Sequence, residues 1–193
     1  MHTKEELYSN KIFFNAALPL VKVIANDVPS LKKQFAHVHA IIQVSAKDPD
    51  APGGKVGMHF VVNSDEWLVH LNKVDPNPHV ELEFKSVEAM NAFFKGKMSP
   101  ATLPKMKGVV THFGAFKAFL MTLLKMSSLL GATEAPKDEA TKELMVKCFF
   151  YLLSSGISQL NKMGHEDIHD WTSKSPDRVY AWAVDGYPSG SAY

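Results

Sequence analysis

The sequence predicts an α+β fold built on a five-stranded, mostly antiparallel sheet with helices packed on one face. Two observations carry this prediction. Four runs between His37 and Lys85 alternate apolar with polar residues, as strands with one buried face do. The segments before and after them instead repeat apolar residues every three or four positions, which is typical of amphipathic helices.

The composition is that of an ordinary globular protein. Of its 193 residues, 46% are apolar and 21% are charged, and the net charge of +1 gives no overall field that would attract nucleic acid. The single cysteine, Cys148, excludes an internal disulfide and favours a reducing, cytoplasmic setting. The N-terminal segment does not have the pattern of a signal peptide. The apolar segments 113–130 and 144–160 contain too many lysine and hydroxyl side chains for membrane spans.

The N-terminal region is predicted to be helical. Apolar residues at spacings of three, four and seven indicate a helix from Lys4 to Ala25, which Pro19 should kink or break. Asn26 and Asp27 then stop the helix, and a short second helix is expected from Pro29 to Phe35.

Four alternating runs follow, at residues 37–47, 56–63, 67–72 and 79–85. Short turns join them, so we expect an antiparallel meander with one apolar and one polar face. A fifth strand is expected from Gly108 to Gly114.

Helices are expected around this last strand. Ser86 is a good N-cap for a helix with an apolar stripe of Met90, Phe93 and Phe94, and Gly96 is a good C-cap. Two further helices are expected at 116–130 and 139–163, and one more strand at 178–184. We therefore divide the chain into a domain at 1–131 and a C-terminal extension at 132–193, packed on the same domain.

Methionine and phenylalanine are frequent from Met90 to Leu130. Such a region is either ordinary core or a flexible lining that accepts variable apolar ligands. The residues concerned are Met90, Phe93, Phe94, Met98, Met106, Phe113, Phe116, Phe119, Met121 and Met126.

The same region contains an ordered set of motifs. Gly96, Lys97, Met98 and Pro100 form a turn after a helix. Gly108, Val110 and Gly114 then fit a strand of the form Gly-x-apolar-x-apolar-x-Gly, and 115–124 fits an apolar helix. With a helix, a strand meander and a helix upstream, residues 29–131 resemble the sterol carrier protein 2 family of small lipid-binding and lipid-transfer domains. His112 stands where that family usually has an aliphatic residue, and residues 132–193 extend beyond the family domain.

The resemblance implies non-enzymatic carriage of a hydrophobic ligand. The helices and the apolar sheet face would enclose a tunnel for a fatty acid, acyl-coenzyme A, sterol-like lipid or phospholipid. His112 would share the face of Val110 on the expected strand, and it is either a polar anchor for the ligand or a hydrogen-bonded core histidine. No catalytic residue, cofactor or metal is expected. The expected lining is Met58, Phe60, Val69, Met90, Phe93, Phe94, Met98, Leu103, Met106, Val110, His112, Phe116, Phe119, Leu120 and Leu123.

Four lysines alternate with apolar residues beside this lining. As a hypothesis, they ring the tunnel mouth and contact the headgroups of an anionic membrane surface or of the ligand. Alternatively, they only keep the surface soluble, with their aliphatic stems covering apolar residues. These lysines are Lys95, Lys97, Lys105 and Lys107.

Histidines offer an alternative chemistry. His37, His39, His59, His70 and His79 are expected on the polar sheet face. If His39, His59 and His70 align, they would suit zinc; otherwise the face is simply solvated.

Two other histidines and the single cysteine are further candidates for chemistry. His165 and His169 are four residues apart, and they are either metal ligands or a polar end to the long helix. Cys148 lies among apolar residues and is expected to be an inert packing residue.

Two alternative functions remain open at this point. In the first, the chain is a small enzyme or accessory subunit that holds a hydrophobic substrate in the same cavity. In the second, it is a structural module that forms a homodimer through the helix containing Leu144, Phe149 and Phe150.

Overall fold

The computed structural model describes residues 13–94, 99–130 and 136–162. Chain contacts divide it into two compact units, one containing Gln34–Phe119 and the other containing Lys11–Lys33 and Leu120–Tyr193. The two units are described separately below. Division of the chain at residue 131 stays a prediction.

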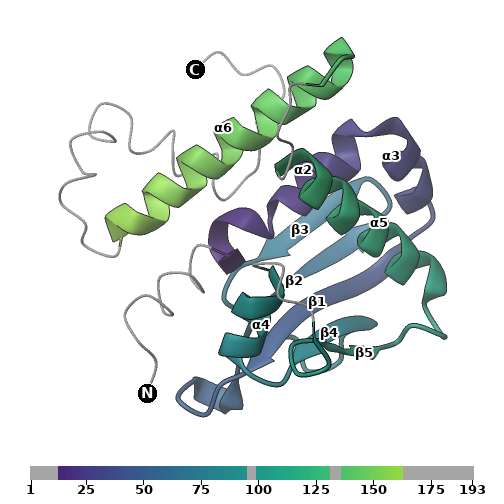
Figure 1. The fold of residues 1–193 in the computed structure, drawn as a ribbon. Coiled ribbons are helices and arrows are strands. Elements are labelled where there is room, and N and C mark those ends of the chain that lie inside the picture. The colour runs from purple at the N-terminus through teal and green to yellow at the C-terminus, as the bar shows by residue number, and fades with distance from the viewer. Residues whose placement is uncertain (1–12, 95–98, 131–135, 163–193) are drawn as a thin grey trace. The chain divides into compact units, whose positions relative to one another are not determined.

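The first unit contains a mixed five-stranded sheet, so the fold is α+β (Figure 1). Its strands lie in the order β3-β2-β1-β4-β5. Their bounds are β1 His39–Lys47, β2 Lys55–Asn63, β3 Glu66–His70, β4 Val80–Phe84 and β5 Lys105–Lys107. Three of the four pairings are antiparallel, and β1 pairs with β4 in parallel.

That parallel pairing corrects the predicted meander. After β3 the chain crosses the polar sheet face instead of turning back, and it enters β4 beside β1. On the way, the connecting loop bonds to β2 and β1, since the Lys73 carbonyl contacts His59 and the Asp75 amide contacts Gln43. A loop of this kind is required because parallel neighbours cannot be joined by a tight turn.

The predicted strand from Gly108 to Gly114 is also wrong. Strand β5 ends at Lys107, and α5 (Phe113–Leu130) has already begun at Phe113. Gly108 has a φ of 74°, and a Cβ built on it would lie 1.8 Å from the His79 carbonyl oxygen. Glycine therefore allows a sharp turn against β4, after which the His112 amide donates to the Gly108 carbonyl and the helix starts.

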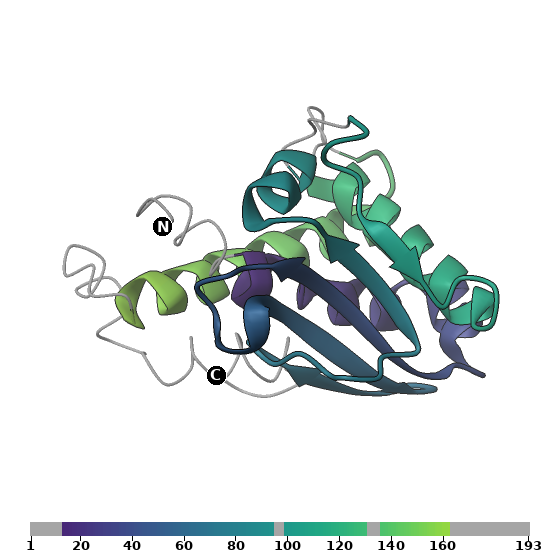
Figure 2. The ribbon, with the colours of Figure 1, turned by 90° about the horizontal axis from the view of Figure 1, so that it is seen from below.

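Helices cover the apolar sheet face within this unit. Helix α4 (Val87–Phe94) begins as predicted, because Ser86 Oγ accepts a hydrogen bond from the Ala89 amide at 3.1 Å. Figure 2 shows α4 and the start of α5 on one side of the sheet. The ring of Phe84 contacts those of Phe93 and Phe94 on α4.

The second unit is helical. It contains the π-helical turn η1 (Phe13–Ala17), α2 (Leu20–Asp27), most of α3 (Pro29–Phe35), the later turns of α5, and α6 (Glu139–Lys162). The predicted break at Pro19 is confirmed, since Pro19 precedes the first residue of α2. Lys147 on α6 bonds Asp27 on α2 at 2.8 Å. Among the described helices, none combines the length and the apolar character that a membrane crossing requires.

Candidate functional site

The apolar sheet face holds the centre of the predicted ligand lining. Met58 and Phe60 on β2 are fully buried, as are Met90 on α4 and Phe119 on α5. The rings of Phe60 and Phe119 lie 6.1 Å apart, so β2 and the start of α5 pack directly together. These four side chains belong to the buried apolar layer of the first unit.

The other predicted lining residues are less buried. Five are half-buried, and these are Val69, Phe93, Phe94, Phe116 and Leu123; His112 has the same intermediate exposure. Leu103, Met106, Val110 and Leu120 are exposed. Met98 lies outside the described residues.

Trp67 on β3 belongs to this face, although it was missed at the sequence level. Its ring packs edge-on against Phe35 and Phe60, at centroid distances of 4.7 and 5.6 Å. The indole N–H is buried and has no hydrogen-bond partner among the described residues. An unpaired buried donor costs about 1–3 kcal/mol. The period-two pattern that put Trp67 on the apolar face was the available signal.

The predicted ring of lysines is not found where it was expected. Lys95 and Lys97 lie outside the described residues. On β5, Lys105 pairs in register with Glu83 and Lys107 with Glu81, whereas Met106 pairs with Leu82. Successive side chains of a strand point to opposite faces, so both lysines lie on the polar face, opposite the apolar lining.

That polar face is not the solvated surface that the sequence suggested. Gln43, Ser45, His59, Glu81 and Glu83 are all buried. The sequence does contain a signal, since two glutamates at alternate positions of β4 lie opposite two lysines at alternate positions of β5. Only the strand pairing reveals that both glutamates meet Lys107.

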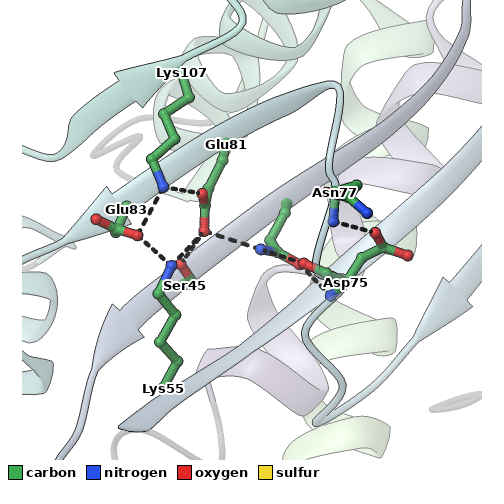
Figure 3. Close-up of polar contacts among 8 residues, drawn as sticks. Ser45, Lys55, Asp75, Asn77, Glu81, Glu83 and Lys107 are labelled. Atoms are coloured by element: carbon green, nitrogen blue, oxygen red, sulfur yellow. Dashed lines mark hydrogen bonds and ion pairs between the residues drawn. The ribbon is translucent and has the colours of Figure 1, made fainter. Parts of the chain in front are cut away.

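Two glutamates and two lysines form a closed ring of alternating charge (Figure 3). The Lys107 ammonium bonds Glu81 Oε2 at 2.8 Å and Glu83 Oε2 at 2.9 Å. Lys55 bonds the same Glu83 oxygen and reaches Glu81 Oε1 at 3.4 Å. Each carboxylate therefore contacts two ammonium groups.

Further hydrogen bonds hold Glu81 in this ring. Its Oε1 accepts from Ser45 Oγ at 2.6 Å and from Gln43 Nε2 at 2.9 Å. Burial alone would raise the pKa of Glu81, but the bonds from Lys107, Ser45 and Gln43 outweigh it and lower that pKa from 4.5 to about 2. The Lys55 hydrogen bond likewise lowers the pKa of Glu83, and Glu81 raises the pKa of Lys107. Both glutamates and Lys107 are therefore charged at neutral pH.

A cavity of about 600 Å³ lies over this ring. Its lining residues come from the polar face, from the loop before β2 and from the loop between β3 and β4. They are Gln43, Pro52, Gly53, Lys55, Val74, Asp75, Pro76, Asn77, Pro78, Glu81 and Lys107.

The histidines do not form the three-residue site that was considered. His59 and His70 pair across β2 and β3 with stacked rings 4.6 Å apart, but His39 lies opposite Asn63 and bonds it at 2.6 Å. Burial and the neighbouring His59 lower the pKa of His70. No group of three potential metal ligands occurs within the described ranges. His165 and His169 lie outside them.

Cys148 is fully buried in α6. Burial raises the pKa of its thiol to about 12, so the reactive thiolate is scarce at neutral pH. This environment is the one expected for a packing residue.

Comparisons of the chain with protein-family models, curated proteins and solved structures gave no match.

Proposed function

We propose that the chain binds and carries a hydrophobic ligand without catalysing a reaction. The observation that carries the proposal is the unpaired indole N–H of Trp67 within an aromatic, apolar layer. A fatty acid, acyl-coenzyme A, sterol-like lipid or phospholipid would bury hydrocarbon against this layer at about 25 cal/mol per Å². One ligand oxygen would accept the orphan hydrogen bond.

The site would lie between the apolar sheet face, α4 and the first turns of α5. Phe93, Phe94 and Phe116 are half-buried there and would move to admit the ligand, while Met58 and Phe60 would form its floor. Methionine and phenylalanine suit this purpose because an acyl chain or ring system needs an adaptable surface with few polar anchors.

Transfer would occur at an anionic membrane surface. From Ala89 to Thr133 the sequence has six lysines and no acidic residue, although the whole chain is nearly neutral. Within this stretch, Leu103, Met106, Val110 and Phe113 are all at least half exposed. Exposed apolar side chains in a lysine-rich stretch fit the interfacial region of a bilayer, where a lysine without an acidic partner contributes about 1 kcal/mol. Lys107 is not counted here, because it is paired with Glu81 and Glu83.

The proposal is tested by ligand content and by binding. Native mass spectrometry of the purified protein should show one lipid or acyl species per chain. In a titration with a fluorescent fatty acid, Trp67→Phe should weaken binding about threefold to tenfold, because it removes one hydrogen-bond donor and keeps the ring packing. Leu68→Ser is the matched control, since Leu68 is the exposed neighbour on the same strand. A ligand-free mass together with no fatty-acid binding would refute the proposal.

A second candidate function is homodimerisation through α6. Val146, Phe149 and Leu153 are about half exposed or more, and spacings of three and four place them on one side of the helix. A dimer by light scattering that Phe149→Glu converts to monomer would support this role. A monomer at all concentrations would exclude it.

A further inference from the structure

We propose that the cavity over the polar sheet face binds a small organic acid, a carboxylate or phosphate, that also carries a hydroxyl or amino group. This site lies on the opposite face of the sheet from the apolar lining. It is independent of the proposed lipid site and would be occupied by a different class of molecule.

The charge ring determines which ligands fit. Glu81 and Glu83 are each held by two ammonium groups, so a metal ion would have to displace a lysine before reaching a carboxylate. The ring thus presents the two ammonium groups of Lys55 and Lys107 to the cavity as hydrogen-bond donors.

Those donors can be counted. An ammonium group has three N–H bonds, and Lys55 and Lys107 each use two of them on Glu81 and Glu83. One N–H of each lysine remains, and both side chains line the cavity with 30% and 42% exposure. Because both ammonium groups bond the same Glu83 oxygen, they lie close enough to hold two oxygens of one acid group.

Asp75 supplies the opposite chemistry on another wall. Its Oδ1 accepts from the Asn77 amide at 2.8 Å, which leaves acceptor capacity on the carboxylate for a ligand hydroxyl or amine. Gln43 fixes this loop, since Gln43 Oε1 accepts from the Asp75 amide at 2.6 Å. Lysine donors and an aspartate acceptor in one cavity therefore select a molecule that is acidic at one end and donates at the other.

The remaining walls suit a small, ordered site. Pro52, Val74, Pro76 and Pro78 are apolar, and prolines restrict the backbone of both bordering loops. A preformed cavity loses less entropy when its ligand binds. Its volume of about 600 Å³ is that of a typical small-molecule site.

Stability alone does not account for the arrangement. Replacing buried ion pairs by apolar residues is often neutral or stabilising in proteins. Two buried glutamates on β4, held by two partly exposed lysines that both line a cavity, are better explained by recognition.

The test is a titration of the full chain with small acids. Binding is monitored through the backbone amide NMR signals of Gln43, Lys55, Asp75 and Asn77. The probes are glycerate and glycerol 3-phosphate, with acetate as an acid that has no hydroxyl and glycerol as the neutral control. At least one of the two hydroxy acids should give saturable shifts below about 10 mM. Glycerol should give none. Preference for glycerate or for glycerol 3-phosphate distinguishes a carboxylate ligand from a phosphate ligand.

Two variants, Lys107→Met and Asp75→Asn, test recognition, and Lys105→Met is the control. Lys107→Met should weaken binding at least about tenfold, whereas Lys105→Met, the exposed lysine two residues earlier on β5, should change it less than about twofold. Asp75→Asn keeps the loop bonds and should reduce glycerate binding to the level of acetate. If the Lys107→Met variant does not fold, the binding result for Asp75→Asn alone tests the proposal.

The proposal is overturned if neither hydroxy acid saturates the NMR shifts, if glycerol binds equally well, or if Asp75→Asn leaves the preference for glycerate over acetate unchanged. Fatty-acid binding is measured on the same variants. It should be unaffected, so failure of one site is not read as failure of the other.

Discussion

One position on a strand decides what Lys107 does. Because side chains alternate, Met106 faces Leu82 while Lys107 faces Glu81. The lysine therefore joins a buried charge ring instead of the border of an apolar site. Its role follows from the register between β4 and β5, which composition alone does not specify.

Ionisation of Glu81 should make the free energy of unfolding depend on pH in the acidic range. Its pKa is lowered from 4.5 to about 2 in the folded chain, so its contribution is complete above about pH 5 and is lost as the pH falls toward 2. Glu81→Gln should lower the free energy of unfolding at pH 7 by about 3 kcal/mol, since each unit of this pKa change corresponds to about 1.4 kcal/mol. Urea unfolding at several pH values would measure this.

The comparison between variants makes the result specific. Glu66→Gln changes an exposed glutamate on β3 and should leave both the stability and its pH dependence unchanged. Glu81→Gln should flatten the curve between pH 5 and pH 2, with the slope due to Glu83 remaining. If the variant and the natural protein lose stability in parallel over this range, Glu81 does not hold the bonds described.

Cys148 should be chemically silent while the protein is folded. Its thiol is fully buried and its pKa is raised to about 12. At pH 8 the reaction with a disulfide reagent should be at least about 100-fold slower in buffer than in urea, because thiolate is the reacting form. Rapid labelling of a chain whose circular dichroism is native would contradict this burial.

At the scale of elements, features that depend on neighbouring residues could be predicted from the sequence, whereas the pairing of the strands could not. The alternation in β1 and β2 and the Ser86 cap of α4 could be read directly from the residues, because each depends on neighbours in sequence. The place of β4 beside β1 could not, since it depends on a loop that crosses the sheet. The polar cavity could not be predicted for the same reason, because its walls come from segments that are separate in the sequence.

The turn at Gly108 can be tested by a matched pair of substitutions. Gly108 and Gly53 both have positive φ, of 74° and 79°, but only at Gly108 would a Cβ collide with backbone, at 1.8 Å. Gly53→Ala should cost about 1 kcal/mol for the left-handed conformation alone. Gly108→Ala should cost about 3 kcal/mol or more, because β4 must also shift.

Thermal and urea unfolding of the two glycine variants give the comparison. Equal stability losses would show that the close approach of Gly108 to His79 does not constrain the turn. A larger loss at Gly108 would explain why the chain leaves β5 after three residues, in spite of the apolar pair Val109 and Val110 that follows.

At the scale of the whole chain, charge is unevenly distributed along the sequence. The net charge is +1, yet residues 89–133 carry six lysines and no acid, so the remaining segments hold all of the negative charge. Local fields act over about 10 Å in ordinary salt. Lys107 is already paired with Glu81 and Glu83, so any attraction to an anionic surface would come from the other five lysines. If the protein delivers its ligand to an anionic bilayer, as proposed, the exposed apolar residues of this stretch would approach that bilayer.

This distribution predicts how the protein binds vesicles. Val110 is 93% exposed and Phe113 is 60% exposed, so a double change to aspartate should leave folding intact. It should reduce co-sedimentation with vesicles containing phosphatidylserine at least about tenfold, because it replaces two inserting side chains with charges that the lipid repels. Leu68→Asp, at an equally exposed leucine on the polar sheet face, is the control and should have little effect.

The same experiment separates membrane docking from ligand binding. Neither Val110 nor Phe113 belongs to the buried apolar layer, so the aspartate double variant should still bind a fluorescent fatty acid in solution. Its transfer of that fatty acid to anionic vesicles should slow, and added salt should slow transfer by the natural protein as well. If the variant transfers the ligand at the natural rate, the lysine-rich stretch does not deliver it, and the exposed side chains serve another contact.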